Sequence, residues 1–191
     1  MSYNFVIVYG SVRTGREGIK AVRFFKQILE NRGHKVTVVD PLEQKLPLLD
    51  KMYKELKDDA PQVMKYLSET FRSADGIVVV SAEYNHSIPP ALTNILDHFL
   101  EEYFWKPSAI VSYSVGGFGG VRAAMQLRAL LPEIGLPTIP SLFPISKIHE
   151  SLSDDGKDLT GKYEKRVQRF VEELEWYTSA LKRQRKEGVP Y

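Results

Sequence analysis

The stretch IVVVSAEYNHSIPPALTNILDHF, from Ile77 to Phe99, shows most directly how this chain folds. It opens with four apolar, β-branched residues, which is typical of a strand buried on both faces. A mostly polar run from Ser81 to Ser87 follows at once. Two prolines, Pro89 and Pro90, then begin a helix, because the missing N–H of proline costs nothing in the first turn. The stretch therefore predicts a buried strand, a polar loop and a helix in direct succession.

The rest of the chain repeats this alternation of short β-rich patterns and longer helical ones. Strands are expected at 5–10, 34–40, 76–81, 108–114 and near 137–141, and helices at 16–33, 60–75, 89–105, 122–135 and 161–186. Apolar strands that alternate with helices predict a parallel sheet covered on both faces. Right-handed crossovers make such a sheet doubly wound. We expect one α/β domain over residues 1–191, whose last helix spans about 161–186.

Composition and charge exclude several classes of function. The 191-residue chain contains no cysteine, which excludes disulfides, thiolate catalysis and cysteine-based metal sites. Its formal net charge of +2 gives no electrostatic case for nucleic acid or a membrane surface. The four histidines lack the spacing of metal ligands, so no metal is expected. Without a signal-peptide pattern or a membrane-spanning apolar run, we expect a cytoplasmic protein with no membrane partner.

In doubly wound folds, ligands bind beyond the carboxyl ends of the strands, where the strand order reverses. The first loop in that place is GSVRTGREG, from Gly10 to Gly18. A helix N-terminus attracts anions, and the hydroxyl of Ser11 and the guanidinium groups of Arg13 and Arg16 add donors suited to a phosphate. The spacing is not that of a P-loop, since arginine and glutamate replace its lysine and hydroxyl residue. A plain glycine turn with two solvated arginines is an equally weighted alternative.

The second loop is the polar part of the opening stretch. The two prolines stiffen it, and Glu83, Tyr84 and Asn85 carry hydrogen-bonding side chains. A rigid polar loop of this kind suits the hydrogen-bonding edge of a flat heterocycle. Capping of the next helix by Asn85 or Ser87 would explain one polar residue, but not the whole run.

The third loop, SYSVGGFGGVRAA, places four glycines around Phe118. Bare backbone at Gly116 and Gly117 can lie against a ring and point N–H donors at it. The alternative is a flexible turn, which glycine pairs often mark.

Two acidic residues outside the three loops, Asp40 and Asp97, give weaker indications of function than the loops do. Asp40 ends the second strand, as the ribose-binding acid does in dinucleotide folds, although the G-x-G-x-x-G motif is missing. This leaves an NAD-binding Rossmann dehydrogenase as a remote alternative. The adjacent Asp97 and His98 are expected to form a solvated pair on a helix surface. No G-x-S-x-G elbow supports a serine hydrolase.

Taken together, the three loops resemble the NADPH-dependent FMN reductase family of the flavodoxin-like fold. The resemblance runs from Phe5 to about Ser141 and is most specific in SAEYNHSIPPALTNILDHF, which is similar to the family pattern P-E-Y-N-x-S-x-P-G-x-L-K-N-x-I-D. It implies a five-stranded parallel sheet of order 2-1-3-4-5 with helices on both faces.

The resemblance also implies a bound FMN and a set of residues that hold it. The implied cofactor-binding residues are Ser11, Arg13, Arg16 and Gly18 for the phosphate, Glu83, Tyr84 and Asn85 along the isoalloxazine, and Ser114, Gly116 and Gly117 against the ring. The second group would act mostly through backbone atoms. No catalytic side chain is expected, because the flavin carries the chemistry.

The sequence departs from the family pattern at four positions. Ala82 stands in place of proline, Pro90 in place of glycine, Thr93 in place of lysine, and Gly18 where many members have serine. Pro90 removes an N–H at the start of a helix. This departure bears on the choice of substrate more than on FMN binding.

The resemblance implies an FMN-dependent oxidoreductase that passes hydride from NADPH or NADH to a quinone or similar small acceptor by ping-pong turnover. The alternatives are a flavodoxin-type electron carrier that does not oxidise NAD(P)H, and a scaffold protein that has lost the cofactor. The helix at 89–105 has an apolar face from Leu92 to Phe104 that is broader than one side of a sheet requires. We therefore expect a homodimer, or a homotetramer, in which this helix packs against a partner chain that closes the pocket.

Overall fold

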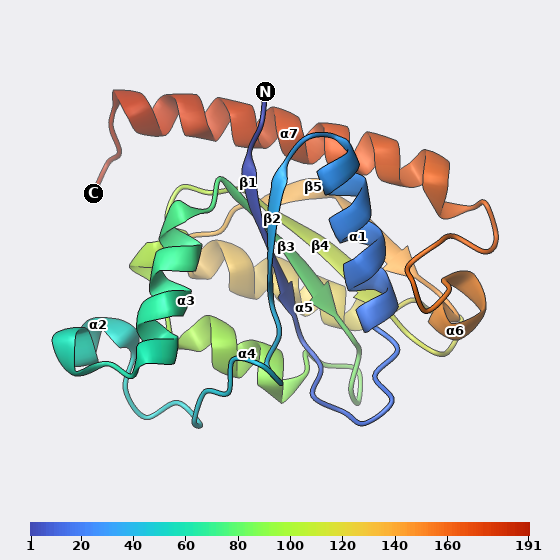
Figure 1. Cartoon of the computed structure of the whole chain (residues 1–191), viewed down its shortest axis with the longest axis horizontal. Helices are drawn as coiled ribbons and strands as arrows, with labels where there is room; N and C mark the ends of the chain where they lie inside the picture. The colour runs from blue at the N-terminus through green and yellow to red at the C-terminus, as the bar shows by residue number, and fades with distance from the viewer.

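The computed structural model describes residues 1–191 and contains one five-stranded, fully parallel sheet. The strands are β1 (Asn4–Tyr9), β2 (Lys35–Val39), β3 (Gly76–Ser81), β4 (Ser108–Tyr113) and β5 (Thr138–Ile145). Their order across the sheet is β2-β1-β3-β4-β5, which confirms the expected topology (Figure 1). β1, β3 and β4 are buried along almost their whole length, as their apolar sequences predicted.

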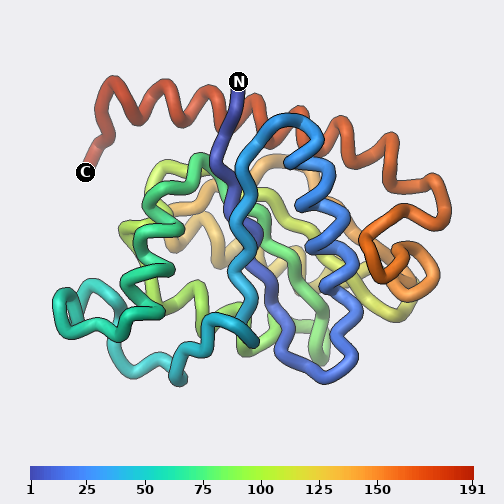
Figure 2. The backbone as a smooth tube through the Cα atoms, in the orientation of Figure 1, coloured from blue at the N-terminus to red at the C-terminus, as the bar shows by residue number.

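The helices lie on both faces of the sheet, and the backbone trace shows the same two layers (Figure 2). They are α1 (Ile19–Asn31), α2 (Tyr53–Leu56), α3 (Gln62–Ser73), α4 (Pro90–Asp97), α5 (Val121–Glu133), α6 (Ile148–Ser151) and α7 (Tyr163–Glu187), with 3₁₀ turns η1 (Lys57–Asp59) and η2 (Glu101–Tyr103). α1 and α7 cover one face, and α3, α4 and α5 cover the other. No helix has the length and apolar character that crossing a bilayer requires.

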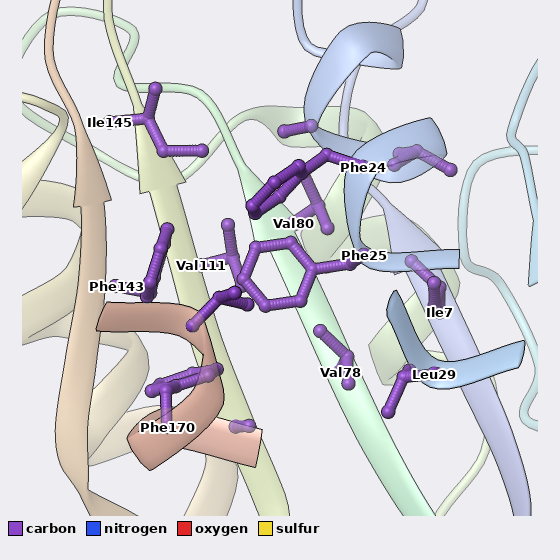
Figure 3. Close-up of a cluster of buried hydrophobic side chains, with 14 of the residues drawn as sticks. Ile7, Phe24, Phe25, Leu29, Val78, Val80, Val111, Phe143, Ile145 and Phe170 are labelled. Atoms are coloured by element: carbon purple, nitrogen blue, oxygen red, sulfur yellow. The ribbon is translucent and has the colours of Figure 1, made fainter. Parts of the chain in front are cut away.

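An aromatic cluster fastens α7 to the sheet (Figure 3). Phe25 of α1, Phe143 of β5 and Phe170 of α7 meet between the layers, with Phe25 and Phe143 edge to face at 5.0 Å between ring centroids. Such aromatic pairs add about 0.5–1.5 kcal/mol each beyond the burial of their area. The start of α7 is capped by Asp158, whose carboxylate accepts the N–H of Tyr163 at 2.7 Å. The C-terminal helix is thus an integral part of the core.

The helix expected at 89–105 is interrupted, and this corrects the argument for a dimer interface there. α4 ends at Asp97, and Leu100 leaves the helical conformation, with φ −148° and ψ −69°. The break lets both Phe99 and Tyr103 reach Phe71 of α3, at 5.2 and 5.0 Å between ring centroids. Most of the apolar face is therefore buried within one chain. Its buried members are Leu92, Ile95, Leu96, Phe99 and Tyr103.

The last strand is longer than the expected segment near 137–141, because β5 continues to Ile145 after a register shift against β4. Arg128 of α5 donates to the carbonyls of Ile139 and Pro140 at this edge of the sheet. A charged side chain and prolines protect an edge strand from pairing with other chains. All five strands point the same way. The loops after β1, β3 and β4 therefore meet at the carboxyl ends of the strands, which are at the lower side of the sheet in Figure 1.

Candidate functional site

The loops after β1, β3 and β4 enclose a cavity of about 410 Å³. Its lining residues are Ser11, Arg13, Thr14, Gly15, Arg16, Glu17, Ala82, Glu83, Tyr84, Tyr113, Ser114, Val115 and Gly116. The volume lies within the usual range for small-molecule sites. Most residues expected to bind a cofactor meet here, whereas Gly18, Asn85 and Gly117 lie outside the lining.

Arg16 does not offer a free charge to this cavity. Its guanidinium forms a two-pronged ion pair with Asp40, both N–O distances being 2.5 Å, and also donates to the carbonyl of Ser11 at 3.0 Å. The hydrogen bonds to Asp40 raise the pKa of Arg16, so the guanidinium stays charged. Asp40 is buried and fully engaged, so the alternative in which it binds a ribose is wrong. Arg16 and Asp40 instead pin the first loop to the end of β2.

Arg13 brings a positive charge to this cavity, and no acidic side chain of the protein pairs with it. Its side chain forms no ion pair, and its guanidinium carbon lies 5.7 Å from the ring centroid of Tyr84. The hydroxyl of Tyr84 is in turn 2.6 Å from the hydroxyl of Ser11. A hydrogen bond and a cation–π contact therefore join the first loop to the second.

Peptide N–H groups without a partner surround the cavity. The lining residues whose N–H donates no hydrogen bond within the protein include Thr14, Gly15, Arg16, Ala82, Glu83, Val115 and Gly116. Thr14, Gly15 and Arg16 lie just before the N-terminus of α1, where an anion is favoured. The other four residues come from the second and third loops. A phosphate and the carbonyl edge of a flavin both need donors, so the donor set of this cavity fits FMN.

The second loop owes its rigidity to a tight turn rather than to a helix cap. Tyr84 and Ser87 exchange backbone hydrogen bonds of 3.0 and 2.9 Å. Asn85 and His86 between them have φ angles of 51° and 62°, as in a type I′ turn. α4 has no side-chain cap, so the capping role considered for Asn85 or Ser87 is wrong. Asn85 lies exposed at the tip of the turn.

Glu83 directs its carboxylate at α5. It accepts the N–H groups of Arg122 and Ala123, at 2.9 and 3.3 Å, and lies 3.4 Å from the Arg122 guanidinium. A carboxylate at a helix N-terminus satisfies donors that have no partner within the helix. The Glu83 side chain therefore positions α5, and its backbone remains available to a ligand.

The third loop is held in place, so a flexible turn does not describe it. The Ser114 hydroxyl donates to the Gly116 carbonyl at 2.8 Å and accepts the Gly119 N–H at 2.9 Å. Gly120 has φ 74°, and an added Cβ would lie 2.7 Å from the carbonyl oxygen of Tyr113. At Gly116 and Gly117, by contrast, an added Cβ would meet no protein atom within 4 Å. Glycine is thus required by the fold at Gly120 but not at Gly116 or Gly117.

Sequence reasoning missed Tyr113, which lines the cavity. It is the last residue of an apolar strand, and such a position is typical of the core. Its place at the carboxyl end of β4, next to the glycine loop, was the available signal. The structure also overturns the solvated pair: His98 is buried at 1% exposure, and its Nδ1 lies 2.6 Å from the carbonyl of Asn94. Partial burial raises the pKa of Asp97.

The sheet order is that of a flavodoxin-like fold, and the donor-lined cavity at the carboxyl ends of its strands suits a phosphorylated, planar ligand. Residues 3–150 match the NADPH-dependent FMN reductase family, and the chain belongs to that family. The protein is therefore an enzyme, a flavin-dependent oxidoreductase with FMN as cofactor and NAD(P)H as electron donor. Membership of this family counts against an electron carrier that does not oxidise NAD(P)H and against a scaffold without a cofactor.

Named relatives agree with this family. The chain is similar to an NAD(P)H-dependent FMN reductase of Saccharomyces cerevisiae, with 31% identity over 146 residues that cover 70% of this chain and 75% of the relative. A quinone reductase of Pseudomonas putida is 28% identical over 179 residues, covering 90% and 92% of the two chains. Among solved structures, the flavoenzyme NAD(P)H:(acceptor) oxidoreductase from Paracoccus denitrificans superposes with a TM-score of 0.77 at 21% identity, covering 95% and 98%. That likeness concerns the fold.

Proposed function

We propose that the protein passes hydride from NAD(P)H through bound FMN to a quinone or similar small acceptor by ping-pong turnover. The observation that supports this proposal most strongly is the cavity at the carboxyl ends of the strands. Peptide N–H groups from three loops surround it without hydrogen-bond partners, next to the Arg13 guanidinium, which has no acidic partner. Similarity to a protein named quinone reductase supports the class of acceptor. Bound FMN supplies an isoalloxazine that accepts a hydride from NAD(P)H and gives two electrons to the acceptor.

The residues of the chain bind and orient the cofactor. We propose that Arg13, the Ser11 hydroxyl and the free N–H groups from Thr14 to Arg16 hold the phosphate. The Arg16 guanidinium acts through its ion pair with Asp40 by fixing this loop. Gly18 begins α1 behind the loop.

The planar ring is proposed to lie along the other two loops. The backbone of Ala82 and Glu83 and the ring of Tyr84 form one side, with Asn85 shaping the turn. The backbone of Ser114, Val115 and Gly116 forms the other, continued by Gly117. No side chain needs to act as an acid or a base.

The test is an absorption spectrum of the purified protein before and after anaerobic addition of NADPH. A yellow protein whose flavin absorbance bleaches with NADPH and returns with a quinone is the expected result. Parallel double-reciprocal plots against the two substrates would support ping-pong turnover. A protein that stays colourless when FMN is added would refute the proposal, as would a flavin that NADPH leaves oxidised.

We propose that the protein forms a homodimer, on different grounds from the buried face of α4. Val115 and Phe118 in the third loop and Met125 in α5 are exposed by 60%, 68% and 59%. Exposed apolar side chains next to a cavity favour a covering partner, and a second copy would close the cavity. Light scattering during size exclusion checks this, and a monomeric mass at micromolar concentration would contradict it.

The cysteine-free chain suits a reducing compartment, which supports a cytoplasmic location.

A further inference from the structure

Gly18 and Tyr113 meet where α1 begins. Gly18 is buried and has an ordinary helical conformation, with φ −64°, so its backbone does not require glycine. Space requires it instead, because an added Cβ would overlap the end of the Tyr113 ring and its hydroxyl. The hydroxyl of Tyr113 thus occupies the volume that a side chain at residue 18 would fill.

The Tyr113 hydroxyl has hydrogen-bonding capacity to spare. The one hydrogen bond that this hydroxyl makes within the protein is with the hydroxyl of Tyr9 at 3.4 Å, which is longer than a normal O–H···O hydrogen bond, although the Ser11 hydroxyl also lies close by. The Tyr113 side chain is only 5% exposed, so water cannot readily compensate. Burial raises the pKa of Tyr113 far above that of free tyrosine, which keeps the hydroxyl protonated and able to donate.

This hydroxyl lies at the anion-binding end of the cavity. Tyr113 lines the same space as Thr14, Gly15 and Arg16, and it lies against Gly18, the residue just before α1. The guanidinium of Arg16 is already committed to Asp40, so the cavity needs further donors at this end. A neutral hydroxyl at a helix N-terminus suits a phosphate oxygen.

We propose that the Tyr113 hydroxyl donates a hydrogen bond to the phosphate of FMN and takes the place of a side chain at residue 18. This inference rests on the proposed binding of the phosphate at the first loop. Tyr9 is a positioning residue: its hydroxyl faces that of Tyr113, and the Arg16 guanidinium carbon lies 5.0 Å above the centre of its ring.

The experiment titrates the apoprotein with FMN and with riboflavin, which lacks the phosphate, and follows flavin fluorescence. The Tyr113→Phe variant keeps the ring that fills the space beside Gly18. We expect it to bind FMN about tenfold more weakly than the wild type, because a hydrogen bond to a charged group is lost. Its affinity for riboflavin should not change.

The matched control is Tyr103→Phe. The Tyr103 hydroxyl is fully buried without a hydrogen-bond partner, and it lies on the other face of the sheet. That variant should bind FMN and riboflavin like the wild type, and both apoproteins should keep the wild-type circular dichroism spectrum.

Two outcomes would overturn the inference. One is equal FMN affinity in Tyr113→Phe and the wild type. The other is an equal loss of affinity for FMN and riboflavin, which would mean that Tyr113 shapes the cavity and does not contact the phosphate. Failure of the wild type to bind FMN at all would refute the proposed function and is distinguished by the first titration.

Discussion

Two arginines in the first loop look alike in sequence but differ in their surroundings. Arg16 is neutralised by a buried aspartate and fixes the loop, whereas Arg13 is exposed and has no acidic partner. A charge that is already paired gains little from a second anion, whereas an unpaired guanidinium gains a full charge-assisted hydrogen bond. At the scale of single residues, Arg13 should therefore contribute more directly to phosphate binding than Arg16.

Replacing Arg13 with glutamine should weaken FMN binding by about 10- to 150-fold, because a hydrogen bond to a charged group contributes roughly 1.5–3 kcal/mol. Fluorescence titration of the apoprotein measures this. Lys35→Gln provides the control, since this exposed cation lies at the start of β2, at the opposite end of the sheet. Equal affinities in the Arg13 and Lys35 variants would show that Arg13 does not bind the phosphate.

Lys106 gives the fold a pH dependence. Its ammonium donates to the carbonyls of Glu102 and Arg72, at 2.6 and 3.0 Å, but burial lowers its pKa to about 7. In the unfolded chain the pKa is about 10.4. Between these values the unfolded state binds more protons than the folded state, so stability rises with pH, by at most about 1.4 kcal/mol per pH unit.

We therefore expect the free energy of unfolding to rise relative to that of a Lys106→Met variant between pH 7 and pH 9. Urea denaturation at several pH values measures the difference. If the difference stays constant across this window, Lys106 keeps an ordinary pKa in the folded protein.

At the scale of elements, the break after α4 decides where its apolar side chains go. A continuous helix to Trp105 would have left part of this surface for a partner chain. The turn at η2 brings Tyr103 back onto α3, so this apolar surface belongs to the core. Apolar residues on α4 should therefore stabilise the single chain.

Leu96→Ala should lower the free energy of unfolding by about 2–5 kcal/mol, because the side chain is fully buried. The same change at Leu48, which is 84% exposed, should alter it by less than about 0.5 kcal/mol. Urea denaturation gives both values, and light scattering of each variant should give the wild-type mass. A Leu96 variant with wild-type stability but a lower mass would show that α4 lies in the interface between two chains.

At the scale of the whole molecule, α7 packs the C-terminal part of the chain against the first helix and the sheet. Its residues Val167, Phe170 and Leu174 are buried with α1 and β5, and Lys182 pairs with Asp75 at 2.7 Å. We propose that residues 1–191 are one domain that unfolds as a unit, since the last helix shares its core with the first elements.

Thermal unfolding should then give one transition with the same midpoint by far-UV circular dichroism and by tryptophan fluorescence. In a Trp105→Phe variant the remaining indole is Trp176, on α7 itself. An earlier transition in its fluorescence than in the circular dichroism signal would show that α7 detaches independently.

Much of the fold and part of the site could be predicted from sequence. Strands, helices and the three loops after β1, β3 and β4 follow from local patterns, and seven of the ten expected binding residues line the cavity. Tyr113 was missed because it ends an apolar strand, as core residues do, and only its place at the carboxyl end of β4, next to the glycine loop, marks it as a site residue. The side-chain role of Glu83 could not be predicted, because its partners at the start of α5 are 39 positions away or more.

The sequence by itself determined the alternation of strands and helices, the parallel sheet and the edge at which its polar loops meet, because these depend on periodicity and on residues that begin and end each element. Only the tertiary structure decided which charges are free and which side chains share a space. Arg16 meets Asp40, and Tyr113 displaces any side chain at Gly18, through strand register and helix packing. Such contacts join distant segments, and no local pattern specifies their geometry.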